Sequence, residues 1–227
     1  MVTEVVDSSQ LANVAAERIA SALISAIAAD GQASLALAGG TTPRAAYEVL
    51  ARISGIDWGR VNVYFGDERA VPATDPDSNF RMAEGALFSR ISLPESNIHR
   101  VQTELSDRDA IATSYEALLP ERFSLMVLGI GEDGHTASLF PGSPALEERT
   151  RRFLPVIGPK PPPERFSVTP PVIEAARQTI VLATGAGKAT AVARALKGAL
   201  DIRSTPSALA RGGLWLLDHA AAAELGA

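Results

Sequence analysis

One histidine stands beside a carboxylate in a pattern that suits acid–base chemistry. In the segment Gly129-Ile130-Gly131-Glu132-Asp133-Gly134-His135, Asp133 precedes His135 by two positions. A carboxylate at this spacing can orient the imidazole and raise its basicity, as a general base requires. A surface histidine beside an incidental acid is the alternative. The position of His135 after an apolar stretch and within a glycine-rich turn favours a functional role.

Two glycine-rich segments resemble nucleotide-binding motifs without completing them. Residues 129–134 spell G-x-G-x-x-G, but Pro141 stops the helix that a dinucleotide fold needs. The segment Thr184-Gly185-Ala186-Gly187-Lys188 has Leu182 where a nucleotide P-loop has glycine, and Ala189 where it has a hydroxyl. A helix N-terminus beside Lys188 can still hold a single phosphate. A solvated lysine is the alternative.

The turn Gly39-Gly40-Thr41-Thr42-Pro43 has the composition of a phosphate-binding turn. Two glycines let the backbone approach an anion, the threonines offer hydroxyls, and Pro43 suits the first position of a helix. Free N–H groups at that helix N-terminus would face the ligand. An ordinary capped helix start without a ligand explains the same residues, and the turn alone does not decide between the two.

The segment Gly66-Asp67-Glu68-Arg69 places two acids and a guanidinium after another apolar stretch. Arg69 could pair with a substrate anion or with a developing oxyanion. A local salt-bridge set that supports the loop is the alternative. We expect that structural role for Glu68 and a functional role for Asp67 and Arg69.

The positions of the apolar runs predict an α/β fold in which these turns converge. Continuous apolar stretches are typical of parallel strands that are covered on both faces. They alternate with helical patterns, so we expect a mostly parallel sheet with right-handed crossovers. All the turns would then lie at the carboxyl ends of the strands, where open α/β folds bind ligands. The expected strands are Ser34–Ala38, Val61–Phe65, Leu125–Ile130, Thr179–Ala183 and Leu214–Leu217, and the expected helices between them are Pro43–Arg52, Asn79–Phe88, Arg108–Leu118 and Lys188–Leu200.

Both ends of the chain fit one domain that covers residues 1–227. An amphipathic helix is expected to start near Asp7 or Ser8 and to end at Gly31. The proline-rich stretch 158–163 is the one linker-like segment, but a strand pattern at Arg165–Thr169 resumes directly after it. We therefore expect a stiff surface loop inside a single domain.

Composition excludes several classes of function. The 227 residues carry 21 basic and 26 acidic side chains, so the net charge of −5 argues against nucleic-acid or anionic-membrane binding. The absence of cysteine removes disulfides and thiolate metal sites, and three scattered histidines predict no metal site. No uninterrupted apolar run approaches the roughly 18 residues that span a bilayer, and no signal peptide is recognisable, so we expect a cytoplasmic protein.

Four blocks of the sequence, in order, resemble the 6-phosphogluconolactonase family: LALAGGTTPRAAYEVL, VYFGDERAVP with DSNFRMAEGALF, LMVLGIGEDGHTASLFPG, and RFSVTPPVIEAA before TGAGKA. The resemblance implies a Rossmann-like three-layer α/β sandwich that hydrolyses 6-phospho-D-glucono-1,5-lactone in the oxidative pentose phosphate pathway, with no metal or organic cofactor. It implies His135 as the base, oriented by Asp133. It implies Asp67 and Arg69 at the sugar and lactone end. It also implies a phosphate site made of Arg165, Lys188 and the turn Gly39, Gly40, Thr41 and Thr42.

Two other interpretations of the sequence remain open. Glucosamine-6-phosphate deaminase shares several of these blocks but has a glutamate before the proline where this chain has Phe140. Because a phenyl ring cannot accept a proton, that position favours the lactonase. A non-catalytic sugar-phosphate sensor is disfavoured because such regulators carry a basic DNA-binding segment ahead of the sensor. We expect a monomer or a weak homo-oligomer whose partner is the small-molecule lactone.

Overall fold

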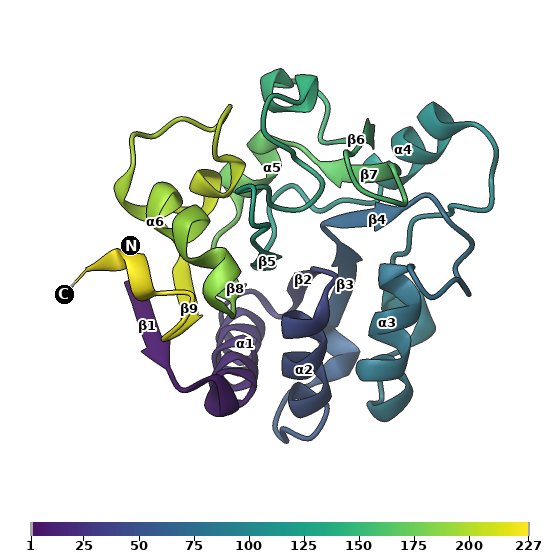
Figure 1. Ribbon diagram of the computed structural model, residues 1–227. Coiled ribbons are helices and arrows are strands. Elements are labelled where there is room, and N and C mark those ends of the chain that lie inside the picture. Colours follow the sequence, from purple (N-terminus) through teal and green to yellow (C-terminus); the bar gives the residue numbers. More distant parts are fainter. Residues whose placement is uncertain (1, 227) are drawn as a thin grey trace.

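The computed structural model describes residues 2–226 and is built around one large parallel sheet (Figure 1). Its six strands run in the order β1-β9-β8-β5-β2-β3, and every neighbouring pair is parallel. This confirms the expected α/β class with a parallel central sheet. The strands are β1 (Val2–Val6), β2 (Ala33–Leu37), β3 (Val61–Phe65), β5 (Leu125–Gly129), β8 (Thr179–Ala183) and β9 (Leu214–Asp218).

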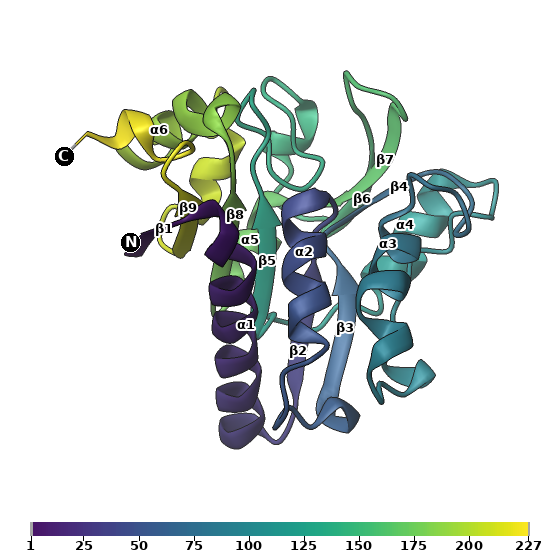
Figure 2. The ribbon, with the colours of Figure 1, turned by 60° about the horizontal axis from the view of Figure 1, so that its bottom comes forward.

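Helices cover both faces of this sheet, which explains the continuous apolar character of its strands (Figure 2). Successive strand residues point to opposite faces, so Leu35 packs in one core and Ala36 in the other. One face packs against α1 (Ser8–Asp30), α2 (Thr41–Leu50) and α3 (Asn79–Ala86), and the other against α4 (Arg108–Glu116), α5 (Pro170–Ala175) and α6 (Ala189–Lys197). The three layers confirm the expected sandwich.

A second, antiparallel sheet was not anticipated from the sequence. Its three strands, in the order β4-β7-β6, are β4 (Asp67–Arg69), β7 (Glu164–Val168) and β6 (Phe153–Ile157). The strand expected at Arg165–Thr169 is β7. The segment 67–69, expected as a simple turn, forms β4 because it pairs with β7. The proline-rich residues 158–163 form the loop between β6 and β7, and the N–H of Gly158 closes it by donating to Pro163 O at 2.7 Å.

Helix α1 ends at Gly31, as the sequence predicts, and its composition is strongly apolar. Gly31 closes it in the left-handed conformation with φ of 78°, and Asp7 occupies the N-cap position without a side-chain hydrogen bond. By length and composition alone α1 could also cross a membrane. However, Leu11, Ile19 and Leu23 are buried in the core, so packing within the fold accounts for the apolar face.

Two buried tyrosines fix the strand ends that lead into the glycine turns. The hydroxyl of Tyr47 accepts the N–H of Ala38 at 2.9 Å and donates to the carbonyl of the same residue at 3.1 Å. Tyr115 does the same for Phe65, at 2.7 and 3.2 Å. Burial raises the pKa of both tyrosines, so the hydroxyls stay protonated as donors. The chain therefore enters each turn from a fixed point.

The variant Tyr47→Phe should lower the free energy of unfolding by about 1–3 kcal/mol, because it leaves a buried N–H and a buried carbonyl of Ala38 without a partner. Urea unfolding at neutral pH measures the loss. Tyr64→Phe is the matched control, since the ring of Tyr64 is buried but its hydroxyl has no hydrogen bond within residues 2–226. Equal losses in the two variants would contradict the role given to Tyr47.

Candidate active site

Loops from distant parts of the chain meet beyond the carboxyl ends of the central strands. Thr42, after β2, and Thr184, after β8, are joined by a hydrogen bond of 2.8 Å between their hydroxyls. A Cβ at Gly187 would stand 2.8 Å from Oε1 of Glu132, so the loop after β8 also touches the loop after β5. The loops that carry His135 and Lys188 are therefore neighbours at the same edge of the sheet.

The turn after β2 requires both of its glycines. A Cβ at Gly39 would stand 1.9 Å from Oδ1 of Asn79, so no larger residue fits there. Gly40 has φ of 105° and occupies the N-cap position of α2. Thr41 and Thr42 line a small hollow of about 210 Å³ with Thr184. The first N–H groups of α2 lack helical partners, so this turn can receive an anion.

His135 is held by the carboxylate that the sequence analysis paired with it. Nδ1 of His135 lies 2.6 Å from Oδ1 of Asp133, which also accepts the backbone N–H of His135 at 3.2 Å. Burial acts to raise the pKa of Asp133, but His135 and Lys160 outweigh it, so this pKa lies below its ordinary value. An ionised Asp133 assigns the proton to Nδ1 and leaves Nε2 free. Gly131 permits the arrangement, because a Cβ there would stand 2.0 Å from Nδ1.

Arg165 is a buried cation on β7, directly opposite Arg69 on β4. Its Nε donates to Pro162 O at 3.0 Å and its Nη2 to Lys160 O at 3.4 Å, so the proline-rich loop holds the guanidinium. Burial lowers the pKa of Arg165, with Asp67 opposing this effect and Arg69 adding to it. Within residues 2–226 no carboxylate oxygen lies within 4.0 Å of either guanidinium.

Phe140 connects Arg165 to His135. Its ring centroid lies 4.7 Å from that of the imidazole and 5.6 Å from Cζ of Arg165, a cation–π distance. Gly158 allows this packing, because a Cβ there would stand 2.7 Å from the Phe140 ring. The histidine and the arginine therefore belong to one site, with an aromatic ring as the shared contact.

Asp67 and Glu68 point to different partners, as their different expected roles require. Asp67 accepts hydrogen bonds from Oγ of Ser138 at 2.7 Å and from Nδ2 of Asn79 at 3.1 Å. Glu68 accepts the backbone N–H groups of Asn79 and Phe80 at the start of α3. Burial raises the pKa of Glu68, although these N–H groups oppose the effect. Within residues 2–226 Glu68 forms no ion pair, so it supports the start of α3 through backbone N–H groups and not through the expected salt-bridge set, whereas Asp67 contacts the histidine loop through Ser138.

The turn after β8 holds Lys188 at the start of α6. Gly185, with φ of 90°, donates its N–H to both carboxylate oxygens of Asp218 at 3.0 Å. Lys188 follows in a short 3₁₀ turn, and no carboxylate lies within ion-pair distance of it among the described residues. Lys188 lies in this 3₁₀ turn and Arg165 on β7, so the two expected phosphate ligands come from separate elements.

Sequence reasoning missed three residues of this site. Lys160 was treated as part of a linker-like stretch, yet its charge acts on Asp133. Asn79 was expected only as a helix start, yet it contacts both Gly39 and Asp67. Ser138 was not singled out, yet its hydroxyl donates to Asp67. For Asn79 and Ser138 the one available signal was their place within blocks that carry the family resemblance, whereas Lys160 lies outside those blocks.

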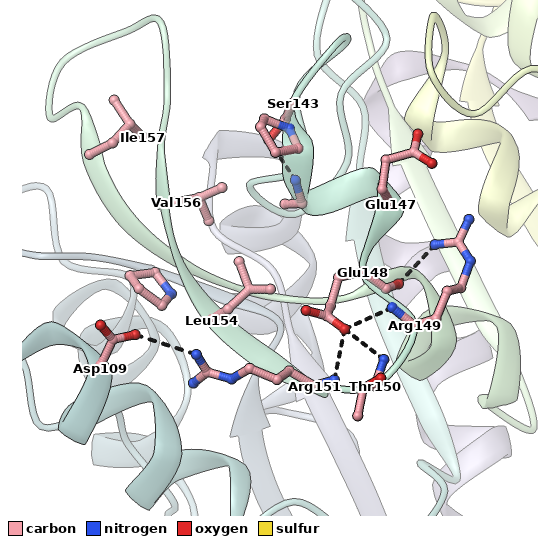
Figure 3. A pocket seen from close by; sticks show the side chains of 13 residues that line it. Asp109, Ser143, Glu147, Glu148, Arg149, Thr150, Arg151, Leu154, Val156 and Ile157 are labelled. Carbon is pink, nitrogen blue, oxygen red and sulfur yellow. Dashed lines mark hydrogen bonds and ion pairs between the residues drawn. The ribbon is translucent and has the colours of Figure 1, made fainter.

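Two other kinds of site were considered. Among residues 2–226 no group of three or more His, Asp or Glu side chains could hold a metal ion. A cavity of about 770 Å³ lies between β6 and residues 143–151, and none of the expected site residues lines it (Figure 3). Two of its charged groups already have partners: Arg151 binds Asp109, and Glu148 accepts backbone N–H groups of residues 149–151 (Figure 3).

Residues 6–216 match the family described as glucosamine-6-phosphate isomerases/6-phosphogluconolactonase. The 6-phosphogluconolactonase of Streptomyces coelicolor is 40% identical, over 96% of this chain and 92% of that protein. The 6-phosphogluconolactonase of Mycobacterium tuberculosis is also 40% identical, over 96% of each chain.

Solved structures agree with the sequence comparisons. 6-Phosphogluconolactonase from Trypanosoma cruzi superposes with a TM-score of 0.86 at 28% identity, over 100% of this chain and 97% of that chain. A monomeric glucosamine-6-phosphate deaminase shares the fold, with a TM-score of 0.87 at 22% identity over 99% of this chain and 100% of that chain. The match over most of the chain, together with the curated relatives, shows that this chain belongs to the 6-phosphogluconolactonase family.

Proposed function

We propose that this chain hydrolyses 6-phospho-D-glucono-1,5-lactone to 6-phospho-D-gluconate in the pentose phosphate pathway, with His135 as the general base and without a metal ion. One observation carries the proposal. A histidine bound by a carboxylate at 2.6 Å lies one aromatic ring away from a buried arginine that lacks a carboxylate partner among residues 2–226. A proton acceptor and an anion-binding group therefore share one site. The name that the curated relatives of this chain share, 6-phosphogluconolactonase, indicates the substrate.

The 6-phosphate is bound by Arg165, Lys188 and the turn Gly39–Thr42. A buried guanidinium without a counter-ion is costly, and a bound phosphate would relieve that cost. The first N–H groups of α2 add donors of fixed direction. Residues from both sheets would contact one substrate, so we propose that residues 1–227 act as a single domain. We also propose a cytoplasmic location for it.

His135 carries out the proton transfers of the reaction. Because its Nδ1–H donates to Asp133, Nε2 can take a proton from a water molecule as the water oxygen attacks C1 of the lactone. The tetrahedral oxyanion is stabilised by Arg69 or by N–H groups of a glycine turn. Protonated His135 then returns the proton to the departing ring oxygen, and the ring opens. A positioned base contributes roughly 10²–10⁴-fold to the rate, and an oxyanion donor roughly 10²–10³-fold.

A deaminase reaction on glucosamine 6-phosphate is the competing function, because the fold is shared. That reaction needs a further proton acceptor near the histidine, and the ring packed against His135 here is that of Phe140. A coupled assay that compares the lactone with glucosamine 6-phosphate tests the assignment. Rapid lactone hydrolysis with negligible ammonia release is expected, and robust ammonia release would overturn the proposed function.

The variant His135→Ala should lower kcat by roughly 10²–10⁴-fold with little change in KM, because it removes the proton acceptor and leaves the phosphate ligands in place. Initial rates of lactone hydrolysis, corrected for spontaneous opening, measure the effect. His219→Ala is the control, since the imidazole of His219 is exposed and Asp7 is its one ion-pair partner within residues 2–226. Near-normal turnover by His135→Ala would remove this residue from the mechanism.

The variant Arg165→Ala should raise KM for the phosphorylated lactone by about tenfold or more, because a charge-assisted contact to phosphate is lost. It should also abolish discrimination against the unphosphorylated lactone. Arg108→Ala is the matched control: Arg108 lies 5.9 Å from the ring centroid of Phe166, as Arg165 lies over Phe140, but it pairs with Glu164. If Arg165→Ala changes KM equally for the two lactones, Arg165 does not bind the phosphate.

A further inference from the structure

The turn that follows His135 has an unfavourable backbone conformation. Ala137 has φ of 48° and is the one non-glycine residue with positive φ among residues 2–226. The turn is closed by the N–H of Leu139, which donates to Thr136 O at 2.9 Å. Positive φ at this position of a tight turn normally calls for glycine. A conformation of this kind persists only where the surrounding contacts hold it.

Ser138 supplies two of the contacts that hold this turn. It is fully buried, and its Oγ donates to Oδ2 of Asp67 at 2.7 Å. Its backbone N–H donates to Oγ of Ser167 at 3.2 Å. Asp67 on β4 and Ser167 on β7 are directly opposite each other in the small sheet. Ser138 therefore ties the histidine loop to the sheet that carries Arg69 and Arg165.

A third contact ties the same turn to the large sheet. Oγ1 of Thr136 donates to the carbonyl of Gly129, the last residue of β5, at 2.9 Å. The turn thus bridges the two sheets. Its position sets where His135 stands relative to the cations of β4 and β7.

We propose that Ser138 is a positioning residue for His135, and that it acts through Asp67. The inference rests on the proposed lactonase function. Because Ser138 is fully buried, it cannot touch substrate and is no nucleophile. Among the described residues its hydroxyl is one of two side-chain donors to the Asp67 carboxylate, the other being Asn79. Without it, Oδ2 of Asp67 loses its donor and the strained turn loses its link to β4.

The consequence for catalysis is a loss of rate rather than of affinity. A displacement of about 1 Å between a catalytic group and the reacting atoms can cost about 10²-fold in rate. The proposed phosphate ligands lie on β7, in the 3₁₀ turn that precedes α6 and in the turn after β2, and within residues 2–226 no hydrogen bond joins Ser138 to them. We expect Ser138→Ala to lower kcat about tenfold and to change KM less than twofold.

Ser124→Ala is the control, because the half-buried hydroxyl of Ser124, like the buried hydroxyl of Ser138, bridges two segments. Its Oγ accepts the N–H of Ser34 at 3.1 Å, at the amino ends of the strands. Both variants should lose similar thermal stability, but Ser124→Ala should keep kcat within twofold of the wild type. An unchanged kcat in Ser138→Ala, or equal losses of kcat in the two variants, would overturn the proposal. A raised KM with normal kcat would also overturn it.

A double-mutant cycle tests whether the effect passes through Asp67. If it does, the variant Asp67→Ala combined with Ser138→Ala should be no slower than Asp67→Ala alone, because Asp67→Ala already removes the acceptor of the Ser138 hydroxyl. Multiplying effects would show that Ser138 acts independently of Asp67 and would overturn that part of the proposal.

An NMR measurement separates failure of this proposal from failure of the proposed function. The chain has three histidines, so variants of His99 and His219 assign the imidazole resonances. Ser138→Ala should shift the signals of the His135 ring and leave the other two in place. If the wild type lacks lactonase activity, the proposed function fails, and this shift still decides the role of Ser138. Unmoved His135 signals would overturn it.

Discussion

Burying Arg165 without a carboxylate partner is the physical constraint on which the site depends. A buried cation is strongly destabilising unless hydrogen bonds or a nearby π-system compensate. Here carbonyl oxygens of Lys160 and Pro162 accept two of its N–H groups, and the ring of Phe140 lies beside the guanidinium. These neutral contacts hold the cation, and Asp67 acts on its charge without forming an ion pair within 4.0 Å. An arginine held in this way remains available to an anionic ligand.

The small antiparallel sheet determines which side chains lie beside Arg165. Directly opposed residues of antiparallel strands place their side chains on the same face. The pairings Arg69–Arg165 and Asp67–Ser167 therefore bring two cations, a carboxylate and a hydroxyl to one surface. The stiff loop of residues 158–163 connects β6 to β7 and supplies the carbonyl groups. The large sheet contributes the glycine turns of the candidate site, and the small sheet contributes these paired side chains.

The sequence predicted the large sheet well because burial on both faces leaves a strong local signal. Val61–Phe65 and Thr179–Ala183 are mostly apolar segments, and both form strands with the expected bounds. The small sheet has no such signal. β4 is three charged residues after a glycine, and β6 contains Pro155, so neither resembles a strand until β7 pairs with both. β1 was missed because half-exposed residues at a chain end form it only by pairing with β9.

The contacts of the candidate site also divide into those that a local sequence pattern indicates and those that depend on the fold. Asp133 and His135 are two positions apart, so the local sequence could indicate their contact, whereas the contact of Ser138 with Asp67 spans 71 positions and has no local signature. The link from His135 through Phe140 to Arg165 likewise depends on the fold.

The identity of residue 140 has a physical consequence that its place in the sequence alone does not reveal. A carboxylate at this position would lie beside both the imidazole and the guanidinium, given the present contacts of the Phe140 ring. It would pair with Arg165, cancel the charge that we assign to phosphate binding, and compete with Asp133 for the histidine. Phenylalanine instead packs against both groups and adds no charge. The site then keeps Asp133 as the carboxylate on His135, and Arg165 has no carboxylate bound to it within residues 2–226. This arrangement suits a base that activates water for attack on an anionic lactone better than a residue that moves protons to and from carbon.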